Sequence, residues 1–587
     1  MSESAPADRP SNAPAPRPRH WLWPTFAVLF AAVGVMTSNG ADPDLWGHYQ
    51  YGKEALRDGE LATTTTWSYA VEGHPWVNHE NLAEIATAWT ADRFGIPGLT
   101  IGKLLLAIVI FGCAIWSCRR RGAGWATIGL VAILAADNIR FHWQFRPHAW
   151  TYAYFAVMVL ILGEAFAGWQ GVARRWREMF SLQSVDPDPP SLPRLRLLWL
   201  LPPLMFAWTN THGGFAAGLA IACSYLGMRM LQGWNWWGRA SIPRQLRIGM
   251  MIAATILASL MNPYGPGLHL WMLDTLGAAP PEIGDWAPLP IWTRQATGFW
   301  LLIAVVGFSL LRTSRRRDPV QLCLLALTLW QGLSHCRHIC FFAIFCAFWM
   351  PAHLQSAIEP IRNSWRATLQ GREPSPVIRR VLGGVFVLWL GMLALRLGPQ
   401  LSTIPVERSE YPVSAMQFLR QHDLRGRTMV TFNWAQYAIA CFAQDSTDEP
   451  SRVAIDGRLN TCYPRPVLDI YLDFLLGEPQ PGARLRARDS APYDPTRALT
   501  YQEPDLFLLD RGQQPAIRTI MASPEWVLLY QDSLAQVWGR RDRYDDPASP
   551  DYFPPQRRSI GEMPQVGAVA WPAFPKSPRA AVVASRP

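Results

Sequence analysis

Residues 38–60 read SNGADPDLWGHYQYGKEALRDGE and follow directly on an apolar run. Asp42 and Asp44 stand two residues apart, and His48 follows one helical turn after Asp44. Carboxylates and imidazoles transfer protons and bind divalent metal ions, so these three side chains could form a site. Asp44 is also a candidate N-cap for the polar helix that follows. The polar cluster of residues 38–60 can therefore be a helix cap, part of a linker or a functional site.

Further polar residues stand where other apolar segments end. They are His79 and Glu80 in PWVNHE, Arg140 and Arg146 in RFHWQFRPH, His212 in NTHGG and Arg337 in HCRH. Histidine–acid pairs such as His79 and Glu80 offer ligands for a divalent ion, but pairs far apart in sequence are also typical of hydrogen-bonded residues at an interface. His212 either belongs to a tight turn with two glycines or lines a cavity. The metal requirement stays open.

The elements that must position these residues are membrane helices. Half of the residues are hydrophobic and only 17% are charged, well below the usual quarter. Apolar segments of about the length that crosses a bilayer recur through the first 400 residues. We predict a mainly α, polytopic protein with about eleven transmembrane helices in residues 21–398. The predicted segments are 21–38, 99–117, 124–137, 148–167, 197–210, 214–231, 247–261, 297–312, 319–334, 338–355 and 379–398.

Arginine-rich loops orient these segments. Basic blocks precede the first segment and recur at 118–122, 173–178, 243–247, 312–318 and 362–380. With a cytoplasmic N-terminus and a retained first segment, all of them lie on the cytoplasmic side of the inner membrane. The polar motifs then lie on the outer face, where Arg140, Arg146 and Arg337 bind phosphate or are simply solvated. The net charge of +10 is scattered over these loops, so no nucleic-acid partner is predicted.

The outer loop of residues 39–98 contains two apolar stripes at helical spacing. Both predict helices that lie in the membrane interface, with Asn78 as N-cap and Gly95 as stop of the second. The stripes are Leu45, Tyr49, Gly52 and Leu56, and Leu82, Ile85, Ala86 and Trp89.

The composition shifts after the last apolar segment. We predict that residues 403–542 form an extracytoplasmic α/β domain with a partly parallel sheet. In it, residues 414–422 should be helical, and the strands should be 427–433, 451–458, 505–511 and 526–532. Asp456 and Arg458 either bind a ligand at a strand end or form a local pair, which is the favoured interpretation. Cys441 and Cys462 could pair as a disulfide. Residues 1–20 and 543–587, rich in proline, are predicted to be disordered.

The first outer loop resembles that of the GT-C superfamily of integral-membrane glycosyltransferases. A D-x-D-L-W-x-H element at 42–48 leads to a W-V-x-H-E-x-L element at 76–82, as in uncharacterised bacterial membrane proteins grouped with that superfamily. The stretches NTHGGFAAG, NPYG and RHICFFAIF are similar to later elements of the same group. The resemblance covers most of the membrane part but specifies no sugar.

This resemblance implies a bacterial enzyme that takes a sugar from a polyprenyl-phosphate carrier within the membrane lipids. The sugar passes to a glycan, lipid or protein acceptor at the outer membrane surface. Asp42 or Asp44 would supply the base, an arginine fork would hold the phosphate, and some relatives bind a divalent ion. The alternative is a non-catalytic scaffold or a transporter of lipid-linked glycans. A transporter needs ionisable groups within its spans, and the predicted spans are almost free of them, with Glu164 an exception, which favours the enzyme.

Overall fold

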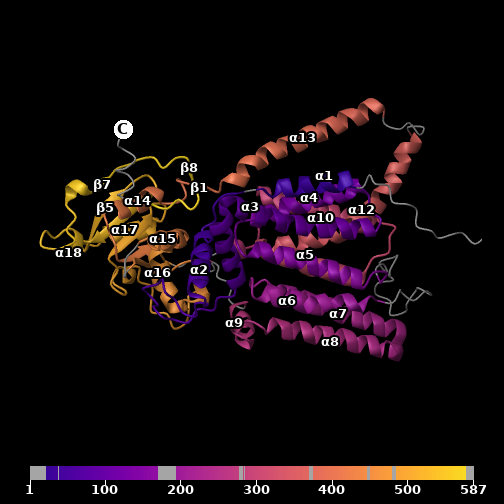
Figure 1. Cartoon of the computed structure of the whole chain (residues 1–587), viewed down its shortest axis with the longest axis horizontal. Coiled ribbons are helices and arrows are strands. Elements are labelled where there is room, and N and C mark those ends of the chain that lie inside the picture. Colours follow the sequence, from indigo (N-terminus) through magenta and orange to yellow (C-terminus); the bar gives the residue numbers. More distant parts are fainter. Residues whose placement is uncertain are drawn as a thin grey trace, which may run out of the picture.

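The computed structural model describes residues 22–37, 39–169, 193–276, 282, 284–368, 375–445, 450–478, 484 and 486–576. Within them the chain forms a helical bundle and, at one end of it, a sheet domain built from the described residues of 403–576 (Figure 1). Residues 1–20, predicted to be disordered, and the basic segment 173–178 are not among the described residues.

The helical bundle consists of long helices that run side by side. Each of the eleven predicted apolar segments overlaps one of them. They are α1 (Leu22–Val35), α3 (Asn81–Arg120), α4 (Trp125–Ile139), α5 (His148–Ala165), α6 (Leu201–Thr209), α7 (Phe215–Trp237), α8 (Ile242–Ser259), α10 (Arg294–Arg312), α11 (Pro319–Ser334), α12 (Ile339–Thr368) and α13 (Pro376–Ser402). Four helices of the described part, within Asn81–Arg120, Arg294–Arg312, Cys336–Ser364 and Pro376–Ser402, are long and apolar enough to cross a membrane. A span count of eleven therefore stays a prediction.

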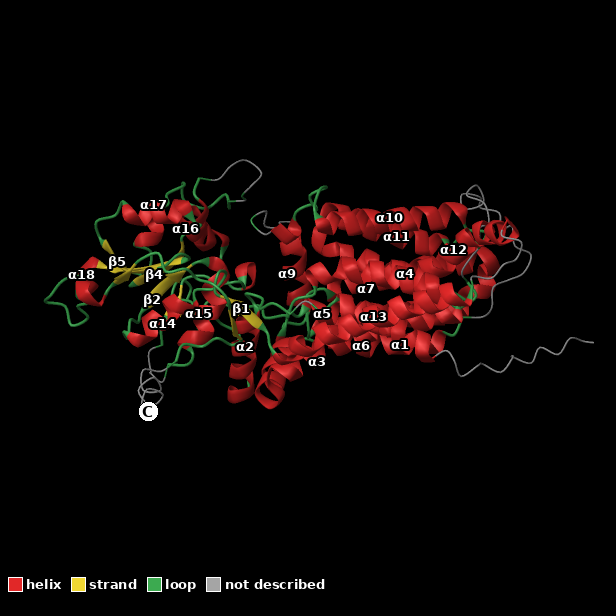
Figure 2. Ribbon diagram, turned by 90° about the horizontal axis from the view of Figure 1, so that it is seen from above, coloured by secondary structure: helices red, strands yellow, loops and turns green. Residues whose placement is uncertain are grey.

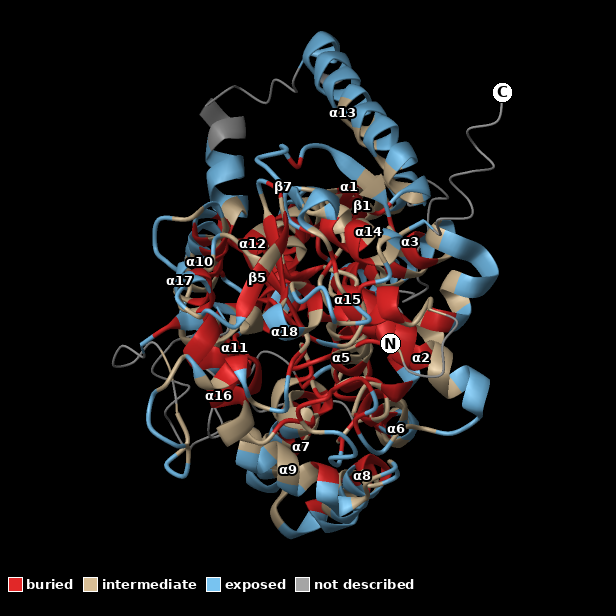
Figure 3. Ribbon diagram, turned by 90° about the vertical axis from the view of Figure 1, so that its left-hand side faces the viewer, coloured by how far each residue is buried: buried red, intermediate tan, exposed pale blue. Residues whose placement is uncertain are grey.

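The bundle packs around α12. In its apolar window 89% of the residues are buried, because Phe341 and Phe345 pack against Phe155 of α5 with ring centroids 4.9 Å apart. By contrast, none of the apolar window of α13 is buried. This helix leans away from the bundle and is almost wholly exposed, as Figures 1 and 3 show.

The sheet domain holds a six-stranded sheet in the order β3-β2-β4-β6-β5-β7. The strands β3 (Arg452–Val453), β2 (Arg427–Val430) and β4 (Leu506–Asp510) are parallel, whereas β6 (Ala535–Arg540) is antiparallel to β4 and to β5 (Trp526–Gln531). The predicted partly parallel sheet is thus confirmed. Four helices accompany it: α14 (Val413–Gln421), α15 (Ala435–Phe442), α16 (Arg465–Leu476) and α17 (Gln514–Met521) (Figure 2).

The chain after residue 542 differs from its predicted disorder. Residues 543–576 contain β7 (Ser559–Ile560), which pairs with β5, and β8 (Ala568–Ala570), which pairs with β1 (Pro405–Glu407). The short helix α18 (Arg541–Tyr544) precedes them. Trp571 is buried and lies 5.2 Å from the ring of Tyr49. A few buried aromatic side chains thus order a segment whose overall composition is polar and proline-rich.

The first outer loop forms the two predicted helices, of which the second is the part of α3 before its kink at Gly95. Residues of both helices pack in the sheet domain's core, and their position in the membrane interface stays a prediction. The first helix, α2 (Leu45–Asp58), buries Trp46 between the rings of Tyr411 and Tyr437, each 4.9 Å away. The indole of Trp46 donates a hydrogen bond to the carbonyl of Pro572. Leu56, of the first predicted stripe, is exposed. Helix α2 therefore joins the sheet domain to the bundle.

Two expectations about the sheet domain have opposite outcomes. Asp456 and Arg458 form the favoured local pair, with the Arg458 Nη2 group 2.8 Å from Asp456 Oδ2. Cys441 and Cys462, however, are both free and buried, so the proposed disulfide is wrong. Cys441 lies within α15 and Cys462 follows the short helix at Leu459–Thr461, and each thiol packs separately in the core.

Candidate active site

Asp42, Asp44 and Arg146 form one group, which we call the acid–arginine cluster. Asp42 Oδ1 accepts hydrogen bonds from Arg146 Nε at 2.6 Å and from the backbone N–H of Asp44 at 3.0 Å. Arg146 Nη1 lies 3.2 Å from Asp44 Oδ2. The turn that Asp42 makes begins α2, and Arg146 stands just before α5, so the start of two helices brings the three side chains together.

The structure separates the roles of the two aspartates. Asp44 precedes α2, but its side chain makes no capping hydrogen bond and points to Arg146 instead. Its side chain is 23% exposed, compared with 4% for Asp42. Burial raises the pKa of Asp42 above its ordinary value, and the guanidinium of Arg146 offsets only part of this effect. Asp44 is therefore the more accessible carboxylate, and Asp42 the one that holds Arg146.

Arg146 also lines a pocket between α3 and the start of α5, which has a cavity volume of about 90 Å³ and is partly open to solvent. Helix α3 is kinked at Gly95, and beyond the kink it lines the pocket with Gly98, Gly102 and Lys103. Lys103 is buried, and its ammonium lies 4.3 Å from the ring centroid of Phe145. Exposed apolar side chains of α3 stand nearby in sequence, namely Phe94, Ile101 and Leu105. The pocket therefore has two basic side chains in its lining, with exposed apolar side chains close by on α3.

His48, Glu80, Glu84 and His212 form a second group, the histidine–glutamate cluster. His48 Nδ1 lies 3.4 Å from Glu84 Oε1 and 3.9 Å from Glu80 Oε2. Burial alone would lower the pKa of His48, but the hydrogen bond with Glu84 and the charges of both glutamates raise it to about 9. His48 is therefore a cation at neutral pH in the metal-free protein.

The proton of His212 can be assigned from its neighbours. Its Nδ1 accepts a hydrogen bond from the backbone N–H of Gly214 at 2.9 Å and lies 2.8 Å from Thr151 Oγ1. Burial lowers the pKa of His212 well below its ordinary value. The ring is therefore neutral with its proton on Nε2, which faces Glu80 Oε1 at 3.5 Å. His79 lies beside it, with ring centroids 6.4 Å apart.

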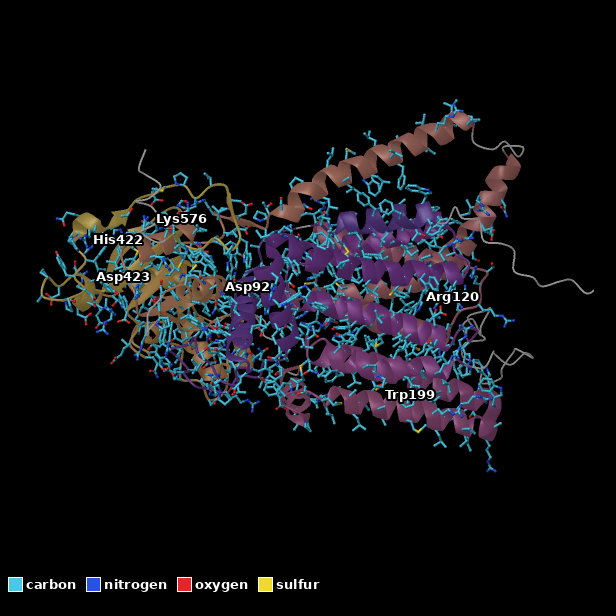
Figure 4. The ribbon with its side chains drawn as sticks, viewed as in Figure 1. Asp92, Arg120, Trp199, His422, Asp423 and Lys576 are labelled. Carbon is cyan, nitrogen blue, oxygen red and sulfur yellow. The ribbon has the colours of Figure 1, made fainter. Side chains whose placement is uncertain are left out.

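Of the remaining two predicted arginines, Arg140 stands apart from these clusters, whereas the charge of Arg337 is close enough to His212 to lower the pKa of that ring. Arg140 pairs with Asp137 at 3.0 Å, one turn earlier in the chain. Arg337 packs over the ring of Trp286, 4.4 Å from its centroid. Asp92 marks the junction beside the sheet domain, whereas Arg120 lies at the opposite end of the bundle (Figure 4).

Three contributors were missed by the sequence analysis. Glu84 stands one turn after Glu80, so helical spacing would have found it. Lys103 is a lone charge in an apolar segment, which is itself a signal of function. Gln436 of the sheet domain carried no such signal, because its place depends on the folding of a distant segment. Lys103 and Arg229, the latter buried against Asp318, also show that the predicted spans hold more charges than expected.

The histidine–glutamate cluster has a donor set that suits a divalent ion. His48, Glu80 and Glu84 each offer one ligand atom, and these atoms all lie within 4.8 Å of one another. One imidazole nitrogen with two carboxylates is typical of sites for zinc, manganese or iron. The acid–arginine cluster fits a cation less well, because the guanidinium of Arg146 already stands between its carboxylates.

No family model and no curated protein matches the chain. Solved structures similar to it include the oligosaccharyltransferase of Archaeoglobus fulgidus tethered with an acceptor peptide, at a TM-score of 0.49 and 10% identity over 84% of this chain and 69% of that one. ArnT from Cupriavidus metallidurans bound to undecaprenyl phosphate gives a TM-score of 0.46 and 13% identity over 87% and 96%. Both are membrane glycosyltransferases of the GT-C superfamily.

Proposed function

We propose that the chain is a bacterial membrane glycosyltransferase that transfers a sugar from a polyprenyl-phosphate donor to an acceptor at the outer face of the cytoplasmic membrane. The observation that carries this proposal is the position of Arg146, which contacts both aspartates and lines the pocket beside Lys103. The resemblance of residues 42–82 to the GT-C superfamily supplies the reaction class.

In this proposal the pocket holds the donor's phosphate and the first part of its polyprenyl chain. Arg146 provides the positive charge that an anionic phosphate needs, and its planar fork matches the phosphate oxygens. Lys103, next to it, gains a reason to be protonated when the anion binds. The exposed apolar face of α3 around Ile101 and Leu105 lets the hydrocarbon chain stay in lipid. The phosphate would then lie beside the aspartates.

Asp44 is the proposed general base. It takes the proton of the acceptor hydroxyl while the new bond forms from that oxygen to the anomeric carbon of the sugar. The bond from the anomeric carbon to the phosphate oxygen breaks, and polyprenyl phosphate leaves with the negative charge that Arg146 and Lys103 stabilise. Asp42 contributes by holding Arg146 in position.

A divalent metal ion is proposed at His48, Glu80 and Glu84. When bound, it would supply positive charge beside Asp44, which already influences His48 electrostatically. Binding would displace the proton of His48, so metal affinity should rise with pH. Metal content measured by mass spectrometry tests this: Glu84→Gln should bind at least tenfold less manganese or zinc than the wild type, and equal binding would refute the site.

The alternative of a transporter or scaffold has less support. Among the described residues, Lys103 lies at the pocket next to the acid–arginine cluster, and Arg229 pairs with Asp318, which caps α11 at the end of the bundle far from the sheet domain. Neither position suggests a substrate path through the middle of the bundle.

Binding of a labelled polyprenyl phosphate tests the proposed donor site. Arg146→Lys keeps the charge but loses the fork, so we expect affinity to fall about tenfold, in line with a charged hydrogen bond. Arg140→Lys is the matched control, because its ion pair with Asp137 lies outside the pocket. Wild-type affinity in both Arg146→Lys and Arg146→Ala would remove phosphate recognition from this residue.

A further inference from the structure

The sheet domain reaches the acid–arginine cluster at one turn, Asp456-Gly457-Arg458, which follows β3. A Cβ atom on Gly457 would lie 2.5 Å from Asp44 Oδ1 and 2.9 Å from Gln436 Nε2. Cβ atoms essentially never approach other atoms so closely, so no larger residue fits without displacing its neighbours. The backbone of Gly457 therefore packs directly against the carboxylate of Asp44.

This turn is held in place from two sides. Asp456 accepts hydrogen bonds from the backbone N–H of Arg458 at 2.9 Å and from the hydroxyl of Tyr463 at 2.6 Å. The guanidinium of Arg458 lies 4.7 Å from the ring centroids of both Tyr51 and Trp76, which belong to the first outer loop. Because the turn is fixed on the same loop that carries Asp44, Gly457 cannot retreat easily from that carboxylate.

Gln436, in α15, completes the contact. It is buried, and a Cβ atom on Gly47 of α2 would overlap its amide group. Among the described residues its Oε1 atom has no hydrogen-bond partner. The amide is thus confined between the backbones of α2 and the Gly457 turn, next to Asp44. Leaving its buried oxygen without a hydrogen bond within the described chain costs stability.

We propose that Gly457 and Gln436 are positioning residues for Asp44, so that the sheet domain is an integral part of the active site. They limit the Asp44 side chain to the orientation in which it faces Arg146. Their role in transfer rests on the proposed function, whereas their control of the Asp44 side chain does not. Misplacement of a catalytic group by about 1 Å can cost about 10²-fold in rate.

Gly457→Ala tests the proposal directly, because the added methyl group must displace Asp44. We expect kcat for sugar transfer to fall 10- to 100-fold. The KM for the donor and the melting temperature should stay within twofold and a few degrees of the wild type. Gly561→Ala is the matched control in the same domain, since nothing lies within 4 Å of the added atom. Wild-type kcat in Gly457→Ala would overturn the positioning role.

A second measurement does not depend on enzymatic activity. In an Asp44→Cys background, the rate at which a thiol reagent labels residue 44 is followed by mass spectrometry of its peptide. Adding Gly457→Ala should change this rate at least threefold, whereas adding Gly561→Ala should not. If the wild type transfers no sugar from any polyprenyl-phosphate donor, the proposed function fails, and the labelling rate still decides the positioning role.

Gln436→Ala covers the case in which Gly457→Ala does not fold. This change removes the amide without adding an atom, so the turn can still form. We expect a 3- to 10-fold lower kcat and a changed labelling rate at residue 44, because the carboxylate gains space to rotate. Wild-type values for both would refute the proposal.

Discussion

Two aspartate–arginine groups meet at the junction of the helical bundle and the sheet domain, and they differ in how far they are buried. Asp456 is fully buried and receives hydrogen bonds from the backbone and side chain of Arg458 and from Tyr463. Asp44 has a contact of 3.2 Å with Arg146, and about a third of the Arg146 side chain is exposed. We call the buried Asp456–Arg458 pair the closed group and the partly exposed acid–arginine cluster the open group.

The difference separates a structural group from a functional one. Asp456 and Arg458 are two residues apart and both buried, so one turn of the chain forms the pair away from solvent. Asp42 and Arg146 are 104 residues apart, and the pair forms only when α2 and α5 are in place. The partly exposed guanidinium of Arg146, beside a pocket, has hydrogen-bonding capacity left for a ligand. The closed group therefore holds the open one in place.

Removing the aspartate should destabilise the protein far more in the closed group than in the open group. Asp456→Ala leaves Arg458 buried without its partner, so we expect the free energy of unfolding to fall by about 3–5 kcal/mol. Asp44→Ala removes a partly exposed carboxylate and should cost about 1 kcal/mol or less. Chemical denaturation of the detergent-solubilised protein measures both. Equal losses would contradict the distinction between a closed and an open group.

The pH dependence of stability tests the histidine–glutamate cluster. The pKa of His48 is about 9 in the folded protein and about 6.5 when unfolded, so its protonation stabilises the fold fully below pH 6.5. This stabilisation, about 3 kcal/mol, is lost as the pH rises through 9. Melting of the metal-free protein between pH 6.5 and 9.5 should therefore show a decline that His48→Gln lacks. Identical slopes in both proteins would refute the raised pKa.

Arg140 provides the smallest expected effect. Its pair with Asp137 is partly exposed and lies outside the pocket, so Arg140→Ala should change the free energy of unfolding by about 0.5 kcal/mol. Polyprenyl-phosphate binding and sugar transfer should stay within twofold of the wild type. A tenfold loss of transfer would mean that the open group extends to Arg140.

Local patterns in the sequence predicted the elements better than the contacts between them. Apolar runs located the helices of the bundle, and the alternation of strands and helices predicted the sheet. The Asp456–Arg458 pair was predictable because it needs only two neighbouring residues. The ordered structure of residues 543–576 was not predictable, because it depends on pairing with β1 and β5 and on burial of Trp571 by distant segments.

The sequence indicated which residues could belong to the site, but not which of them lie together in the folded protein. Asp42, Asp44 and Arg146 were all candidates, yet nothing local distinguished Arg146 from Arg140, since both stand in the same outer segment. Only the packing of α5 against α3 brings Arg146 to the aspartates. Gln436 and Gly457 could not be found at all, because their role depends on how the sheet domain packs on α2.

The most direct test of the proposed active site is the rate of sugar transfer by Asp44→Asn from polyprenyl-phosphate donors. Asn has nearly the shape of Asp, and the Asp44 side chain makes no capping hydrogen bond, so melting temperature and polyprenyl-phosphate binding should stay near wild type. Loss of the base should lower the rate about 10²–10⁴-fold. Wild-type transfer by Asp44→Asn, and by the double variant with Asp42→Asn, would contradict the assignment of the acid–arginine cluster as the active site.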